Sequence, residues 1–145
     1  MPARLPSALG RAEAIRETED YEGHRQGCAG VVRAVTAPAL ALMLMASGFV
    51  HAPQRAEVMR YMWGESRYQP CAHSRMGEGL IGVAGVMRRR LHEYAHVAAG
   101  HCVPARVQIA FLAHEWPRLY PACARRFNAG DLSAFHRCWG KGHRR

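Results

Sequence analysis

The longest apolar stretch of the chain lies at residues 34–52, which carry no formal charge. As one helix, these nineteen residues would extend about 29 Å, enough to cross the hydrocarbon core of a bilayer. Arg25 and Arg33 precede the stretch, and Val50-His51-Ala52 is similar to the small-residue sites at which signal peptides are cut. The stretch therefore predicts an export signal, an uncleaved membrane anchor, or a buried or interfacial helix of the folded protein.

A shorter apolar pattern follows at residues 53–63 and predicts a helix that ends just before Glu65. Pro53 suits a first helical turn, and the apolar residues recur at three- and four-residue spacing: Val58, Met59, Met62 and Trp63. Gly64 weakens the helix, and Pro70 prevents its continuation. Glu65 is therefore expected at a helix end, beneath a proline-containing turn. Burial there would disfavour the charged carboxylate, so Glu65 is a candidate general acid, whereas the ordinary alternative is a solvated glutamate.

The rest of the chain also has helical periodicity. Helices are predicted at residues 86–99, from Pro104 to about Trp116, at 122–128 and at 131–138, with a turn between Pro117 and Pro121. Residues 76–85 contain four glycines and predict tight turns. Residues 12–19 are expected to form a loose helix and residues 141–145 a frayed basic tail. The sequence therefore predicts a mainly α protein.

Three blocks of sequence together resemble the soluble lytic transglycosylases, which are relatives of goose-type lysozyme. The first block is Glu65-Ser66, then Pro70, Ala72 and Ser74; the second is Gly79-Leu80; the third is Phe127-Asn128-Ala129-Gly130. The resemblance covers about residues 53–139. It implies a lysozyme-like domain at residues 53–145. The leader at residues 1–52, with its candidate signal or membrane segment at 34–52, lies outside the resemblance.

This resemblance implies cleavage of the β-1,4 bond between N-acetylmuramic acid and N-acetylglucosamine in peptidoglycan. Glu65 would be the single catalytic residue, acting first as acid and then as base, without a cofactor. The positions that the resemblance assigns to substrate binding are Ser66, Tyr68, Ser74, Gly79, Leu80, Phe127 and Asn128. Trp63 is a further candidate for the sugar cleft.

The chain departs from the family pattern at two positions. Ile81-Gly82 stands where the family has a glutamine that faces the sugar, and Phe127 replaces the usual tyrosine. Glu78, the nearest other acid, occupies an ordinary turn position. A lysozyme-type hydrolase of the same fold and an inactive wall-binding protein therefore remain alternatives.

A second motif, His92-Glu93-Tyr94-Ala95-His96, matches the zinc-peptidase pattern HExxH. Two histidines four residues apart on one helix face can bind zinc while Glu93 activates water, and Glu115 would supply a third ligand. The arginines at 88–90 would repel a metal ion, and the pattern is short. A metal-free protein with two solvated histidines is the alternative that we favour.

Charge and cysteines point to an oxidising compartment and an anionic partner. Residues 53–145 carry the whole net charge of +9, whereas residues 1–52 are neutral. No nucleic-acid-binding signature accompanies the charge, which disfavours a specific nucleic-acid reader. The expected partners are peptidoglycan strands, the inner membrane through residues 34–52, and a larger secretion, conjugation or phage assembly. The expected location is the periplasm, the cell envelope or a phage virion.

Four of the five cysteines lie in the predicted domain and favour two disulfides over a zinc site: Cys71, Cys102, Cys123 and Cys138. None of the four are paired at the two-residue spacing of zinc ligands. If the helix after Pro104 leads away from Cys102 and the chain after Pro121 returns toward it, Cys138 would lie near Cys102 and pair with it.

Overall fold

The computed structural model describes residues 33–74 and 77–140. These residues belong to the unit Arg33–Arg145, which is distinct from Met1–Val32. The expected helix at 12–19 and tail at 141–145 lie outside the described residues. The helices are α2 (Ala37–Ala46), α3 (Ala52–Ser66), α4 (Gly85–Ala95), α5 (Ala105–Leu119), α6 (Pro121–Asn128), α7 (Ser133–Phe135) and a π-helical turn at His136–Gly140. The described residues form two isolated β-bridges and no strand, so the predicted mainly α class is confirmed.

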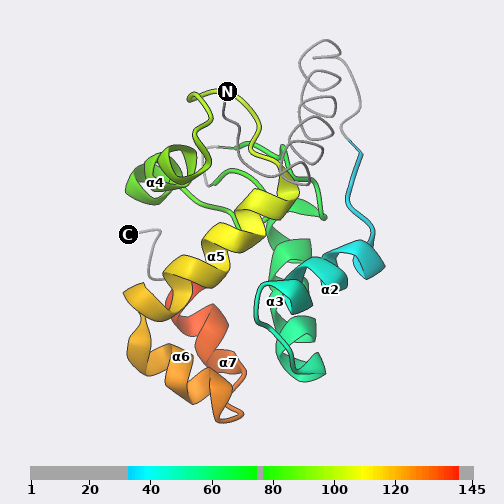
Figure 1. Cartoon of the computed structure of the whole chain (residues 1–145), viewed down its shortest axis with the longest axis vertical. Helices are drawn as coiled ribbons and strands as arrows, with labels where there is room; N and C mark the ends of the chain where they lie inside the picture. Colours follow the sequence, from blue (N-terminus) through cyan, green and yellow to red (C-terminus); the bar gives the residue numbers. More distant parts are fainter. Residues whose placement is uncertain (1–32, 75–76, 141–145) are drawn as a thin grey trace, which may run out of the picture. The chain divides into compact units, whose positions relative to one another are not determined.

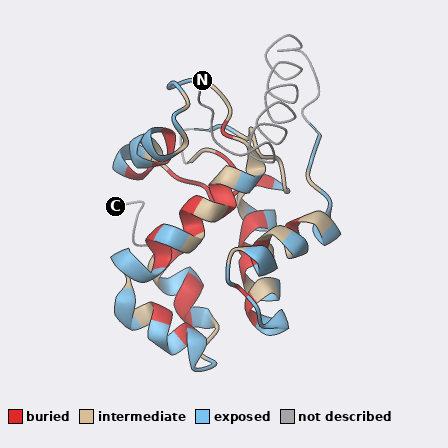
Figure 2. Cartoon of the chain, in the orientation of Figure 1, coloured by how far each residue is buried: buried red, intermediate tan, exposed pale blue. Residues whose placement is uncertain are grey.

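Helix α5 lies at the centre of the unit Arg33–Arg145 (Figure 1). Helices α2 and α4 contact it, α2 also contacts α3, and α6 and α7 pack at its C-terminal end. Buried positions on α3, α5 and α7 alternate with exposed ones, as expected for helices that share one core (Figure 2). The boundary predicted between residues 52 and 53 falls inside this unit, at the start of α3.

The apolar stretch at residues 34–52 does not form one helix, because α2 covers only Ala37–Ala46 and α3 begins at Ala52. Thr36 caps α2 by accepting a hydrogen bond from the Ala39 amide at 3.3 Å, and the helix ends after ten residues at Ser47 and Gly48. Leu40 and Leu44 are fully buried in the core, while Leu42 on the opposite side is exposed. Among the described residues, no helix has the length and apolar character needed to cross a membrane. In the structure, residues 34–52 thus contribute α2 and buried side chains to the core of the unit Arg33–Arg145.

Helix α3 begins with Pro53 in its first turn, as predicted, but continues three residues beyond Trp63. A glycine in a helix costs about 1 kcal/mol relative to alanine, and packing in the last turn offsets this. Ser66 is buried there, and its hydroxyl donates to the Met62 carbonyl at 2.8 Å. The predicted helix end therefore moves to Ser66, and Glu65 lies in the last turn rather than after it.

Helices α4 and α5 differ from prediction at their C-terminal ends. Helix α4 ends at Ala95, because His96 adopts a left-handed conformation (φ 56°) instead of continuing to residue 99. Helix α5 runs through Pro117 to Leu119, and the Tyr120 amide donates to the Trp116 carbonyl at 3.1 Å. The turn predicted between Pro117 and Pro121 is therefore only the junction of α5 and α6.

An aromatic cluster fills the core between α3, α5, α6 and the C-terminal helices. The Trp116 ring centroid lies 5.0 Å from that of Phe135 and 5.8 Å from that of Phe127. Trp139 is fully buried and stacks on Phe135 at 6.5 Å, and the Tyr61 ring meets Phe135 at 5.4 Å. These rings supply large apolar areas, which stabilise a domain of this size.

Two disulfides join the four predicted cysteines, which confirms the disulfides and excludes these thiols as zinc ligands. The pairs are Cys71–Cys102, with Cα atoms 5.2 Å apart, and Cys123–Cys138, with Cα atoms 6.5 Å apart. The predicted Cys102–Cys138 pair is wrong. Helix α5 carries the chain about 22 Å away from Cys102, and the last helices stay at its far end (Figure 1). Disulfides of this kind are typical of an oxidising compartment.

Candidate functional site

Glu65 lies half-buried in the last turn of α3, where the chain leaves the helix sharply. Arg67 (φ 54°) and Tyr68 (φ 62°) are both left-handed, which is unusual for residues other than glycine. Backbone bonds hold this exit: the Arg67 amide donates to Trp63 at 3.0 Å, and the Val35 amide donates to the Tyr68 carbonyl at 2.8 Å. The position of Glu65 is therefore fixed on both sides by backbone structure.

Ser66 connects the end of α3 to the glycine-rich segment. Its hydroxyl donates to the Met62 carbonyl and lies 3.4 Å from the Leu80 carbonyl. Both Ser66 and Leu80 are buried. Ser66 therefore positions backbone next to Glu65, and its side chain does not lie on an accessible surface.

The glycine-rich segment folds into a small set of antiparallel bridges. His73 bridges to Glu78 and Glu78 to Val83, with the Glu78 amide 2.8 Å from the Val83 carbonyl. A Cβ at Gly77 would lie 2.6 Å from the Gly82 carbonyl oxygen, and a Cβ at Gly79 (φ 77°) would lie 2.4 Å from Gln108 Oε1. The space beside these two glycines is thus filled by the protein's own backbone and amide groups, in keeping with the tight turns predicted there.

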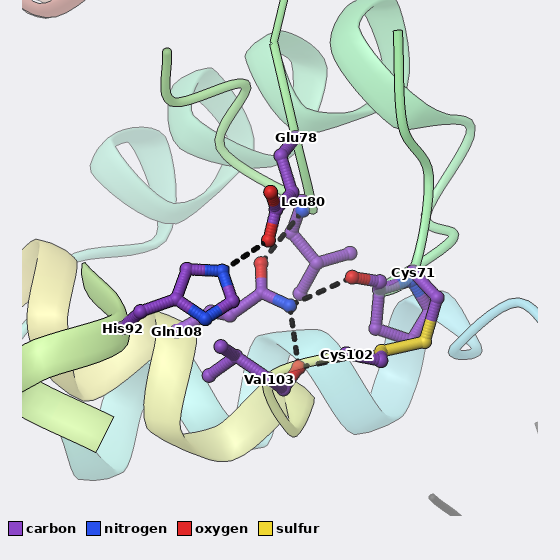
Figure 3. Close-up of a disulfide and its surroundings, with 8 residues drawn as sticks. Cys71, Glu78, Leu80, His92, Cys102, Val103 and Gln108 are labelled. Carbon is purple, nitrogen blue, oxygen red and sulfur yellow. Dashed lines mark hydrogen bonds and ion pairs between the residues drawn. A yellow bond between two sulfur atoms is a disulfide. The ribbon is translucent and has the colours of Figure 1, made fainter. Parts of the chain in front are cut away.

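Gln108 on α5 is the residue that ties this region together (Figure 3). It is only 1% exposed, and its Oε1 accepts a hydrogen bond from the Leu80 amide at 2.8 Å. Its Nε2 donates to the Pro70 carbonyl at 2.8 Å and to the Val103 carbonyl at 2.7 Å. One buried amide therefore joins three segments beside the Cys71–Cys102 disulfide.

Gln108 was not among the site residues predicted from the sequence. The available signal was its spacing, since a polar residue three and four positions before Phe111 and Leu112 falls on the apolar face of α5. A buried glutamine on such a face must have hydrogen-bond partners, and here all of its bonds are to main-chain groups.

Glu78 is not an ordinary turn residue. Its Oε2 lies 2.6 Å from His92 Nε2 (Figure 3). Its Oε1 lies 3.2 Å from Arg88 Nε as an ion pair without hydrogen-bond geometry. His92 is buried, and its Nδ1 faces the Val97 carbonyl at 3.1 Å. Glu78 therefore joins the glycine-rich segment to α4.

The alternative metal ligands are not brought together. His92 faces Glu78, Glu93 is exposed, and His96 lies beyond the helix end in a left-handed conformation. Glu115 is buried with Oε1 2.6 Å from Arg90 and Oε2 3.1 Å from His114. Within residues 33–74 and 77–140, no three His, Cys, Asp or Glu side chains are placed to hold a metal ion.

The predicted substrate-binding positions divide into accessible and buried ones. Tyr68 is half-buried and Ser74 is exposed, as is Asn128, whose Oδ1 accepts from Gln54 Nε2 at 3.0 Å. Gly79 and Leu80 are buried. Phe127, which was also assigned to substrate binding, does not present its ring to a ligand. The ring is 1% exposed and packs against Phe49 and Trp116, because the core rather than a ligand surrounds it.

Comparison with known proteins gives no relative from which a role can be transferred. No protein-family model matches the chain, and no match is found among curated proteins or solved structures. The proposed function therefore rests on the arrangement of Glu65, Ser66 and the segment that Gln108 holds.

Proposed function

We propose that this protein is a peptidoglycan lytic transglycosylase with a lysozyme-like fold and that Glu65 is its single catalytic residue. The observation that carries the proposal is the position of Glu65: half-buried in the last turn of α3, directly before a buried serine that contacts Leu80. This is the position that the three sequence blocks assign to the acid. The contact between Ser66 and the Gly79-Leu80 block brings the first two of those blocks together.

The proposed reaction requires Glu65 to begin its cycle protonated. The C-terminal end of a helix carries partial negative charge, and α3 ends one residue after Glu65.

The reaction then needs one carboxyl in two successive roles. Glu65 donates its proton to the O4 leaving oxygen of N-acetylglucosamine as the bond to C1 of N-acetylmuramic acid breaks. The resulting carboxylate accepts the proton of the muramyl C6 hydroxyl, whose oxygen bonds to C1 and closes a 1,6-anhydro ring. The N-acetyl group of the substrate stabilises the positive charge at C1, so no second enzymatic carboxylate is required. No net proton or water is consumed.

The products of digestion test this proposal. Purified sacculi are incubated with the protein, and the soluble muropeptides are analysed by mass spectrometry. We expect 1,6-anhydromuramyl ends. Reducing muramyl ends would identify the hydrolase of the same fold, and the absence of soluble muropeptides would overturn the proposal.

An inactive wall-binding protein is the second candidate, and the position after Gly79-Leu80 favours it. The family's glutamine is absent there, and Ile81 is fully buried, with its carbonyl accepting from the Tyr61 hydroxyl at 3.3 Å. Such a protein would sediment with sacculi and release no muropeptides.

The location that accords with this function is the cell envelope or a phage virion, as a free enzyme or within a secretion or conjugation assembly. The two disulfides support an oxidising compartment. The basic charge of the chain supports an anionic partner such as the wall.

A further inference from the structure

Trp63 is the one tryptophan of the chain with a large exposed surface. It is 47% exposed, whereas Trp116 is 4% and Trp139 is 0% exposed. Trp116 and Trp139 complete the core. The indole of Trp63 instead lies at the surface near the end of α3, two residues before Glu65.

Two neighbouring side chains hold this indole in place. The Arg67 guanidinium carbon lies 5.0 Å from the ring centroid over its face, and the Tyr68 ring meets it nearly edge-on at 5.0 Å and 69°. Arg67 follows Trp63 by four residues, which places the two side chains above one another at the helix end. The cluster is thus ordered before any ligand arrives.

The backbone supports this arrangement at a conformational cost. Arg67 and Tyr68 are consecutive left-handed residues with full side chains, a conformation that persists only where the surroundings impose it. The Tyr68 carbonyl accepts from the Val35 amide, and the Gln69 amide donates to Ser66 at 3.0 Å. Glycines could adopt the same backbone conformation without strain. The arginine and tyrosine side chains at these two positions therefore come with a conformational cost.

Charge is also exposed at this cluster. Among the described residues, no carboxylate forms an ion pair with Arg67, whereas Arg60 on the same helix pairs with Glu57 at 2.6 Å. Tryptophan, tyrosine and arginine are the residue types most enriched at the energetic centres of binding surfaces. The cluster therefore offers an aromatic face and one uncompensated positive charge.

We propose that Trp63, Arg67 and Tyr68 form an accessory site that binds a glycan strand of peptidoglycan. The apolar face of a sugar ring would stack on the indole, and a carboxylate of the lactyl-peptide stem would pair with Arg67. A nucleic acid would instead need a row of basic residues along its phosphates, and this cluster holds a single unpaired arginine. The proposal rests on the proposed function, which supplies the polymer.

The accessory site is distinct from the site of the chemical step. Two residues along an α-helix correspond to a rotation of about 200°, so Trp63 and Glu65 project from different sides of α3. The cluster therefore holds the polymer while Glu65 acts on another part of it, and it contributes to binding of long strands.

Tryptophan fluorescence tests this site directly, because only Trp63 is broadly accessible. The probe is purified glycan strands carrying peptide stems, solubilised by sonication and added to the full chain with Glu65→Gln, which prevents turnover. We expect the strands to shift the emission and to protect it from iodide quenching. Trp63→Phe in this background should remove both signals and raise the dissociation constant about ten-fold.

Arg67→Gln and Arg89→Gln form a matched pair, since each removes one positive charge and Arg89 is exposed on α4. Only Arg67→Gln should weaken strand binding and reduce its dependence on salt. Binding that is unchanged in the Trp63 and Arg67 variants, or no binding by the parent, would overturn the accessory site. Equal competition by single-stranded DNA would overturn the choice of a glycan. If strands bind through Trp63 while the active chain releases no muropeptides, the proposed catalysis fails and the accessory site stands.

Discussion

His92 Nε2 and Glu78 Oε2 lie 2.6 Å apart, while the other ring nitrogen of His92 faces the Val97 carbonyl at 3.1 Å. Both neighbours of the imidazole are hydrogen-bond acceptors, a carboxylate oxygen and a carbonyl oxygen. The first histidine of the HExxH pattern thus serves as a link between α4 and the segment that carries Gly79-Leu80.

Breaking this link should lower stability. Hydrogen bonds to charged groups contribute about 1.5–3 kcal/mol, so Glu78→Gln and His92→Gln are each expected to lower the free energy of unfolding by roughly that amount. The double variant should lose less than the sum, because the two residues share one interaction. Urea denaturation of the four proteins measures this coupling. Additive losses would show that the pair does not act as a unit.

Replacing Gln108 by Leu should lower the free energy of unfolding more than the same replacement of a half-exposed glutamine. Gln108→Leu leaves the Leu80 amide and the Pro70 and Val103 carbonyls without their partner. A buried unsatisfied polar group costs about 1–3 kcal/mol, so a loss of several kcal/mol in unfolding free energy is expected. Gln69→Leu is the control, with little expected change. Equal midpoints of the two variants in urea would exclude the role assigned to Gln108.

Leu40 and Leu42 lie two residues apart on α2, on opposite sides of the helix, and give a matched test of residues 34–52. Leu40→Ala removes a fully buried side chain and should destabilise the protein by about 2–5 kcal/mol. Leu42→Ala removes one that is 66% exposed and should have little effect. Thermal unfolding of both variants measures the difference. Similar melting temperatures would mean that α2 does not pack into the domain and would return the export or anchor interpretation.

Asp131 should contribute to the acid sensitivity of the fold. The hydrogen bond from the Ser133 hydroxyl, followed by that from Arg137, lowers the pKa of Asp131 below its usual value of 3.8. A lowered folded-state pKa gives stability that is present above the unfolded value and is lost as pH falls through the folded value. Asp131→Asn should therefore reduce the melting temperature at about pH 7 and converge with the parent near pH 2. A difference that is constant across this range would contradict the assignment.

The sequence predicted those features that depend on local spacing. Pro53, Val58 and Met62 defined α3, and the apolar residues from Ile109 to Trp116 defined α5, because three- and four-residue periodicity follows directly from helix geometry. The left-handed residues that end α3 and α4 were missed. Arg67 and His96 carry no sequence signal for this conformation, which neighbouring backbone bonds impose.

Features set by contacts between distant segments were the least predictable. The disulfide pairing depends on where α6 and α7 pack along α5, which no local pattern specifies. The stretch at 34–52 has the composition of a membrane segment, but Gly48 (φ 113°) turns the chain so that Leu40, Leu44 and Phe49 enter one core. At the candidate site, Glu65 was expected just after the helix and lies in its last turn, whereas the roles of Gln108 and Glu78 emerge only from their contacts across the fold.

The activity of Glu65→Gln tests the central claim most directly. The substitution keeps the size of the side chain and removes the transferable proton, so the fold should persist while turnover falls. General acid–base assistance contributes about a factor of 100 to 10,000 in rate. The matched control is Glu93→Gln, because Glu93 is an exposed glutamate on α4 and would be the base of a zinc peptidase.

The measurement is the loss of turbidity of purified sacculi at equal concentrations of folded protein, with and without a metal chelator. We predict that Glu65→Gln clears the sacculi at or near the background rate, while Glu93→Gln and the chelated parent clear them at the parent rate. Clearance by Glu65→Gln at the parent rate would contradict the account.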